Sequence, residues 1–158
     1  MKTVSLGIED FGRMRASNYF YIDKTAFIRE WWENGALVTL LTRPRRFGKS
    51  LMIDTVERFF TVAETNQEAL FGDLEVWSSE KMRRVAGKIP VIRLSFSGVK
   101  APTFEEARDL IVLALRELFG KFPFLTTAPE LDDEERAYFA AFGLSSNPAL
   151  IKYSLRFR

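Results

Sequence analysis

The chain has 158 residues, of which 47% are apolar and 14% aromatic, so it carries enough apolar surface to build a core and is not expected to be disordered. Lys and Arg number 23 against 21 Asp and Glu, and this net charge of +2 predicts no general attraction to nucleic acid or membranes. Cysteine and histidine are absent, which excludes disulfides, thiol nucleophiles and the usual zinc sites. Residues 1–10 lack a signal-peptide core, and no apolar run approaches the roughly 18 residues of a spanning helix. We therefore expect a cytoplasmic protein with no membrane partner.

A strand between two helices is predicted in the first third of the chain. From Asp23, a candidate N-cap, apolar residues recur at helical spacing until the chain reaches Gly35, a residue typical of helix ends. Residues 36–42 form a short, uncharged and mostly apolar run, which predicts a strand buried on both faces of a parallel sheet. Residues 49–60 return to helical spacing and predict a second amphipathic helix.

The rest of the chain predicts one further strand and several helices. Residues 89–96 have the apolar, strand-like character of residues 36–42. Thr103 and Glu106 have the spacing of a capping box, which predicts the start of a helix. Residues 132–142 predict another helix, with acidic residues at its positive end, and a last helix is expected to open at Pro148.

The loop between the first predicted strand and the second helix has a pattern typical of phosphate binding. It runs from Arg43 to Ser50 and reads RPRRFGKS, which ends as the motif GxxxxGK(S/T) does. A loop between a strand and a helix N-terminus directs several backbone N–H groups into one concavity, where the helix dipole adds positive potential. In such a site Gly48 lets the backbone approach the phosphates, Lys49 reaches the β- and γ-phosphate oxygens, and Ser50 ligates Mg²⁺.

Two other interpretations of this loop remain open at the level of the residues alone. Its first half departs from the motif, because Arg43 stands in place of the first glycine, and a basic turn between two ordinary elements would look similar. Four of the seven residues from 43 to 49 are cationic, a density that suits a polyphosphate or a nucleic-acid backbone. Because Phe47 is the one aromatic residue among them, stacking on bases is weakly supported and nucleotide phosphate is favoured.

Two stretches carry a resemblance to a known family. The chain reads TRPRRFGKSLM over residues 42–52, and GIEDFGRMRASNYFYIDKT precedes it over residues 7–25. In both it resembles the prokaryotic AAA-ATPase-like family, in which an Arg-Pro-Arg-Arg-Phe-Gly-Lys-Ser/Thr loop replaces the glycine-led one. The resemblance implies ATP and Mg²⁺ as ligands, with Ser50 on the metal. The implied nucleotide-binding residues are Arg43, Pro44, Arg45, Arg46, Phe47, Gly48, Lys49, Ser50 and Leu51.

The resemblance also implies a fold and a partner domain. The expected fold is α/β, a P-loop NTPase with a three-layer αβα architecture and a parallel sheet, of which this chain would be the incomplete N-terminal portion. We expect one partial domain over residues 1–158 and no second domain, because the sequence shows no repeat or low-complexity linker. Its expected parts are an N-terminal segment and helix at 1–35, the strand, loop and helix at 36–60, and the second strand with its following helices at 61–158.

In the family this domain is commonly followed by a nuclease-like domain of the PD-(D/E)XK type, which makes nucleic acid a partner by implication only. Residues 21–25 match the family segment that, in related ATPases, lies near the adenine. The other interpretation of these residues is a capped helix start with a packed Tyr21. The two interpretations stay open here.

An acid needed for hydrolysis is not identified. A working P-loop ATPase has a second strand that ends in an acid, which holds Mg²⁺ and polarises the attacking water. Residues 89–96 end in Ser97 and Gly98, and the acids at 132–135 do not follow a strand. We therefore expect ATP binding by a Walker A-type loop without hydrolysis in this chain. The alternatives are a nucleic-acid-associated module that uses the basic loop and an inactive truncated product.

Overall fold

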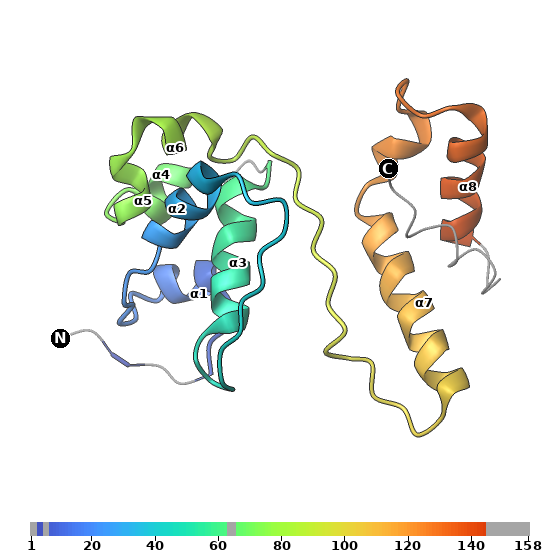
Figure 1. Cartoon of the computed structure of the whole chain (residues 1–158), viewed down its shortest axis with the longest axis horizontal. Helices are drawn as coiled ribbons and strands as arrows, with labels where there is room; N and C mark the ends of the chain where they lie inside the picture. The colour runs from blue at the N-terminus through green and yellow to red at the C-terminus, as the bar shows by residue number, and fades with distance from the viewer. Residues whose placement is uncertain (1–2, 5–6, 63–65, 145–158) are drawn as a thin grey trace. The chain divides into compact units, whose positions relative to one another are not determined.

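The computed structural model describes residues 3–4, 7–62 and 66–144 and divides the chain into two compact units, residues 1–91 and 92–158. Within the described residues every regular element is a helix (Figure 1). The predicted three-layer architecture with a parallel sheet is therefore wrong for this structure, in which no strand is seen among the described residues. No helix in that part of the chain combines the length and apolar character needed to cross a bilayer.

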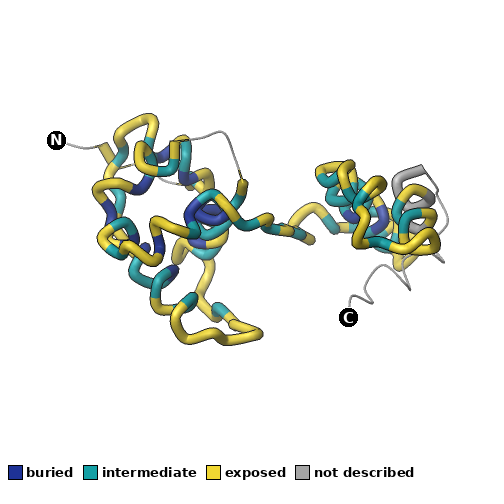
Figure 2. The backbone as a smooth tube through the Cα atoms, turned by 90° about the horizontal axis from the view of Figure 1, so that it is seen from above, coloured by how far each residue is buried: buried dark blue, intermediate teal, exposed yellow. Residues whose placement is uncertain are grey.

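The described part of the first unit is a set of six helices around an aromatic core. They are α1 (Phe11–Ala16), α2 (Ala26–Asn34), α3 (Lys49–Phe60), α4 (Gln67–Phe71), α5 (Glu75–Ser78) and α6 (Glu80–Val85). Figure 2 marks the buried residues of this unit, and the largest that are fully buried include Phe11, Phe59 and Phe71. The core therefore joins α1 to α3 and α4, which lie far from it in the sequence.

Helix α3 supplies the centre of this core. The ring of Phe59 meets those of Phe60 and Phe71 edge to face, with centroids 5.0 and 5.1 Å apart. Phe11 of α1 stacks on Phe71 at 5.0 Å, and Trp32 of α2 stacks on Phe60 at 5.2 Å. Aromatic contacts of this kind add about 0.5–1.5 kcal/mol each beyond the area they bury. The helix predicted over residues 49–60 is confirmed, with the same bounds.

A polar tie fixes the segment ahead of α1 on α3. The buried carboxylate of Asp54 accepts a hydrogen bond from the Phe11 N–H at 2.7 Å and from Arg58 Nε at 2.8 Å. Arg58 also pairs with Asp10 at 2.9 Å, and Asp10 caps α1 by accepting from the Arg13 N–H at 2.7 Å. The Phe11–Asp54 and Arg58–Asp10 bonds join residues 43 and 48 positions apart, so they set where the residues just before Asp10 lie.

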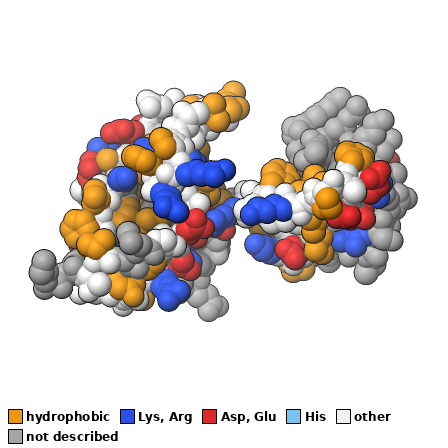
Figure 3. Space-filling view, turned by 90° about the horizontal axis from the view of Figure 1, so that it is seen from below, with side chains coloured by type: hydrophobic (Ala, Val, Ile, Leu, Met, Phe, Trp, Pro, Cys, Tyr) orange, Lys and Arg blue, Asp and Glu red, His pale blue; other side chains and the backbone are white. Residues whose placement is uncertain are grey.

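The two predicted strands are wrong. Residues 36–42 run without regular structure, and their side chains Leu37, Val38 and Leu40 are 101%, 89% and 83% exposed. Residues 89–96 are likewise irregular in the described structure, with Ile92 and Phe96 exposed. A strand requires a neighbouring backbone that pairs with it along its length. The Ile89 N–H donates to the Phe60 carbonyl at 2.8 Å, but neither segment forms a ladder of such bonds among the described residues. Apolar side chains consequently remain on the surface of the first unit (Figure 3).

The second unit contains two α-helices and a short 3₁₀ helix in its described part: α7 (Phe104–Gly120), η1 (Pro123–Thr127) and α8 (Asp133–Leu144). The predicted cap of α7 is confirmed, because the Thr103 hydroxyl accepts from the Glu106 N–H at 3.3 Å. Phe119 of α7 meets Phe139 of α8 edge to face at 4.9 Å. The helix expected to open at 148 lies outside the described residues.

Candidate functional site

The backbone of the loop turns sharply just before α3. Gly48 has φ 75° and ψ 23°, in the left-handed region that favours glycine, and Arg46 also has a positive φ of 67°. No atom lies within 4 Å of the position that a Cβ on Gly48 would take, so the conformation and not crowding favours glycine there. The loop therefore delivers the chain into α3 at Lys49.

The N-terminus of α3 has no side-chain cap. Gly48 occupies the cap position, and no side chain there accepts a hydrogen bond from the first turn. The first amide groups of a helix have no partner within the helix, so they need water, a side chain or a ligand. In a helix of 12 residues these N–H groups and the helix dipole together favour an anion at this end.

The side chain of Lys49 folds back along the loop. Its ammonium group donates a hydrogen bond to the Pro44 carbonyl at 3.0 Å and another to the Arg43 carbonyl. A lysine ammonium has three N–H donors, so one remains for a further acceptor. These bonds close the loop around the uncapped N-terminus of α3. They also give Arg43 and Pro44 a role through their backbone, which does not depend on their side chains.

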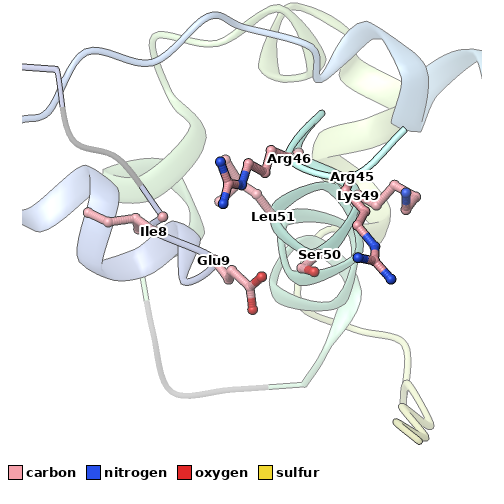
Figure 4. A pocket seen from close by; sticks show the side chains of 9 residues that line it. Ile8, Glu9, Arg45, Arg46, Lys49, Ser50 and Leu51 are labelled. Atoms are coloured by element: carbon pink, nitrogen blue, oxygen red, sulfur yellow. The ribbon is translucent and has the colours of Figure 1, made fainter. Parts of the chain in front are cut away.

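A cavity of about 720 Å³ opens beside this loop. Two segments line it, and their residues are Gly7, Ile8, Glu9, Arg45, Arg46, Gly48, Lys49, Ser50 and Leu51 (Figure 4). Within the described structure, the guanidinium groups of Arg45 and Arg46 form no ion pair. The cavity thus combines unpaired cations, uncapped backbone amides and the Ser50 hydroxyl.

A second, more apolar groove of about 370 Å³ adjoins the cavity. The two share Arg46, Gly48 and Leu51, and the groove adds the aromatic residues Phe20, Tyr21 and Phe47. Burial, the largest influence, raises the pKa of Tyr21 above its usual 10.0, so its hydroxyl keeps its proton at neutral pH.

Residues 21–25 divide between this groove and the core. Tyr21 and Lys24 line the groove. Thr25 is instead fully buried, and its hydroxyl accepts from the Val76 N–H at 3.1 Å. Asp23 accepts from the Thr25 N–H and hydroxyl at 2.8 and 2.7 Å, and from the Glu75 N–H at 2.7 Å. The sequence predicts Asp23 as the N-cap of α2, but this prediction is wrong because Thr25 occupies the cap position. Asp23 instead links the start of α2 to the start of α5 by these hydrogen bonds.

The electrostatics of Asp23 follow from these contacts. Burial acts to raise the pKa of its carboxyl group, but the hydrogen bonds from Thr25 and from the Glu75 N–H favour the ionised form. The net effect lowers the pKa below its usual 3.8. Asp23 is therefore a charged structural acceptor at neutral pH.

The structure places the predicted site residues around one loop. Arg45, Arg46 and the run from Gly48 to Leu51 line the cavity, Phe47 lines the adjoining groove, and Arg43 and Pro44 hold Lys49. Sequence reasoning missed Glu9, which lines the cavity from the segment ahead of α1. No local pattern marks Glu9, because a hydrogen bond across 43 positions brings its segment to α3.

The loop therefore combines an uncapped helix N-terminus with basic side chains, an arrangement that generally favours anions in proteins. The chain belongs to the AAA-ATPase-like family, whose description is "Predicted AAA-ATPase" and whose match covers residues 5–146. The family resemblance seen in the sequence is thereby confirmed, whereas the nuclease-like partner domain stays a prediction.

The chain is also similar to part of one longer curated protein. Over 110 residues the chain is 37% identical to the "Uncharacterized protein in vnfD 5'region" of Azotobacter chroococcum mcd 1. The match covers 69% of this chain and 19% of that protein, so the chain spans about a fifth of the relative. No solved structure matches the chain.

Proposed function

We propose that the chain binds the phosphates of ATP or ADP, together with Mg²⁺, at the loop of residues 43–51. The observation that carries this proposal is the uncapped N-terminus of α3, which opens into a cavity lined by Arg45, Arg46 and Lys49. Membership of a family described as "Predicted AAA-ATPase" supports a nucleotide as the source of the phosphates.

Each part of the loop has a distinct task in this proposal. The N–H groups at the start of α3 bind phosphate oxygens, and the positive φ of Gly48 turns these groups toward the ligand. The third N–H of the Lys49 ammonium reaches the terminal phosphates, while its other two keep the loop closed. Ser50 contributes a hydroxyl oxygen to Mg²⁺, which prefers oxygen ligands and neutralises phosphate charge.

The adjoining groove suits the base of the nucleotide. A purine presents two flat apolar faces and a polar edge, and stacking on aromatic side chains stabilises it by about 1–3 kcal/mol. Phe47 and Tyr21 line this groove. Arg46 and Gly48 line both the groove and the larger cavity, so a base in the groove would lie next to phosphates in the cavity.

Titration with a fluorescent ATP analogue tests this function. Lys49→Ala removes a charge-assisted contact, so we expect affinity to fall by roughly 10- to 100-fold, the equivalent of about 1.5–3 kcal/mol. Lys81→Ala is the matched control, because this exposed lysine on α6 lines neither cavity. Equal losses in the two variants would show that binding is diffuse charge attraction and would refute the proposal.

We propose binding without turnover for this chain. The acid that orients the attacking water in P-loop ATPases is expected at the end of an apolar strand, and no segment of this sequence has that pattern. Phosphate release by the purified chain should therefore match that of Lys49→Ala. Turnover that Lys49→Ala abolishes would contradict this part of the proposal.

A second candidate is a nucleic-acid-associated module. It is favoured by the exposed side chains of Arg43, Arg45 and Arg46, which suit any phosphate backbone. This candidate predicts that the chain binds DNA in a salt-dependent manner and that excess ATP does not displace the DNA. Competition by ATP would favour the nucleotide site instead.

A further inference from the structure

The acid Glu9 lines the cavity beside the loop although it precedes Lys49 by 40 positions in the sequence. It lines the same cavity as Lys49 and Ser50. Figure 4 shows its carboxylate extending from the chain ahead of α1 toward the first turn of α3, on the side where Ser50 lies. The Lys49 side chain points away from it along the loop (Figure 4). A cavity that otherwise presents cations thus holds one carboxylate beside the serine hydroxyl.

The position of Glu9 is set by its neighbours and not by its own contacts. Asp10 pairs with Arg58, and the Phe11 N–H is bound to the buried Asp54, so the chain next to Glu9 is anchored to α3. Among the described residues, the Glu9 carboxylate has no hydrogen-bond or ion-pair partner of its own. It is an anchored acid whose oxygens are available to a ligand.

We propose that Glu9 is the carboxylate that holds Mg²⁺, or waters of its shell, when a nucleotide is bound. This inference rests on the proposed function. Protein sites for Mg²⁺ commonly use one or two carboxylates together with substrate phosphates, and the ion keeps several waters. The described residues contain no group of three or more acids suited to a metal, so the ion needs the nucleotide's phosphates as well. Ser50 and Glu9 supply the protein oxygens from two different segments.

The proposal predicts opposite effects of Glu9 with and without the metal. Without Mg²⁺, the carboxylate faces phosphate oxygens of the same charge and weakens nucleotide binding. With Mg²⁺, the ion lies between the two anions and the carboxylate strengthens binding. Glu9→Gln keeps the shape of the side chain and removes the charge, so it should change the dependence on Mg²⁺ more than the binding itself.

The experiment measures the dissociation constant of a fluorescent ADP analogue in EDTA and in saturating Mg²⁺. It compares the unmodified chain with Glu9→Gln and with Glu33→Gln, an exposed acid on α2 outside both cavities. We expect the gain in affinity from Mg²⁺ to be smaller by roughly 10-fold or more in Glu9→Gln, the usual cost of losing a partner around a bound metal. Glu33→Gln should keep the full gain.

Binding of the analogue in EDTA distinguishes a failure of the Glu9 proposal from a failure of the phosphate site itself. In EDTA, Glu9→Gln should bind the analogue as tightly as the unmodified chain or more tightly, which also shows that the variant is folded. An unchanged Mg²⁺ gain in Glu9→Gln, or an equal loss with and without Mg²⁺, would overturn the role of Glu9 and leave the phosphate site standing. Absence of binding by the unmodified chain in both conditions would overturn the site and, with it, the role of Glu9.

Discussion

The segments on the two sides of the loop use their apolar side chains in opposite ways. Helix α3, after the loop, buries Met52, Phe59 and Phe60 against the core. Residues 36–42, before the loop, leave Leu37, Val38 and Leu40 exposed. Both segments have the apolar content of core elements, yet the structure places only one of them in the core.

The difference lies in how each type of element satisfies its backbone. A helix pairs its N–H and C=O groups within its own segment, so amphipathic spacing is enough to orient it on a core. A strand depends on a second segment for every backbone bond, and its apolar run predicts burial only where that partner exists. In the described structure, residues 36–42 are held to α2 by a side-chain hydrogen bond from Trp31 Nε1 to the Thr39 hydroxyl at 3.0 Å.

The largest expected effect is the loss of a core ring in α3. Phe59→Ala should lower the free energy of unfolding by about 3–5 kcal/mol, because it opens a cavity where rings from α3 and α4 meet. Val38→Ala, at an 89% exposed position, should change it by less than about 0.5 kcal/mol. Urea denaturation of both variants measures the contrast. Similar losses would mean that residues 36–42 are packed in solution.

The polar tie between α1 and α3 should rank next. Asp54→Ala leaves the Phe11 N–H and the Arg58 Nε without their acceptor, and we expect a loss of about 2 kcal/mol or more in the free energy of unfolding. Asp73→Ala is the control, because it removes only the exposed pair with Arg15, worth less than about 1 kcal/mol. If Asp54→Ala costs no more than Asp73→Ala in the same denaturation assay, the tie does not hold α1 in place.

The contact between α2 and α5 should depend on pH. Because the pKa of Asp23 is lower in the folded chain than its usual 3.8, its contribution to stability is present above that value and is lost as the pH falls through the folded pKa. Asp23→Asn should therefore be less stable than the unmodified chain at pH 7, and the difference should shrink below about pH 4. Thermal melts across this range test it, and a constant difference would contradict the assignment.

The smallest effect on stability is expected in the exposed segment. Replacing Leu37 and Leu40 together by Ser should leave the free energy of unfolding nearly unchanged, because both side chains are already in water. It should reduce self-association, since contiguous exposed apolar side chains favour association. Sedimentation velocity at several concentrations measures this. Increased association in the double variant would show that these leucines contact the protein's own surface.

The sequence predicted best where the signal is local. The bounds of α3, the end of α2 at Gly35 and the Thr103 cap all follow from residues within one or two turns of the feature. The short helices α4 and α6 were not predicted, although Asn66 and Ser79 cap their first turns, because they span only 5 and 6 residues and show too little periodicity.

The site was predictable only in part, for the same reason. The loop lies within one stretch of sequence, so its motif marks Gly48, Lys49 and Ser50 together. Glu9 reaches the cavity because Asp54 binds the Phe11 N–H, and such long-range pairs leave no periodic trace. The predicted sheet failed because its two segments show apolar runs without indicating which backbone would pair with them.

The most direct test of the phosphate site is residue-resolved. An amide ¹H–¹⁵N NMR titration with ADP and Mg²⁺ reports on each backbone N–H group separately. Binding as proposed predicts the largest shift changes at the amides of Gly48, Lys49 and Ser50, with smaller changes along α6, which lines neither cavity. Changes that spread evenly over the basic surface, or that leave these three amides unmoved while others shift, would contradict a phosphate site at the N-terminus of α3.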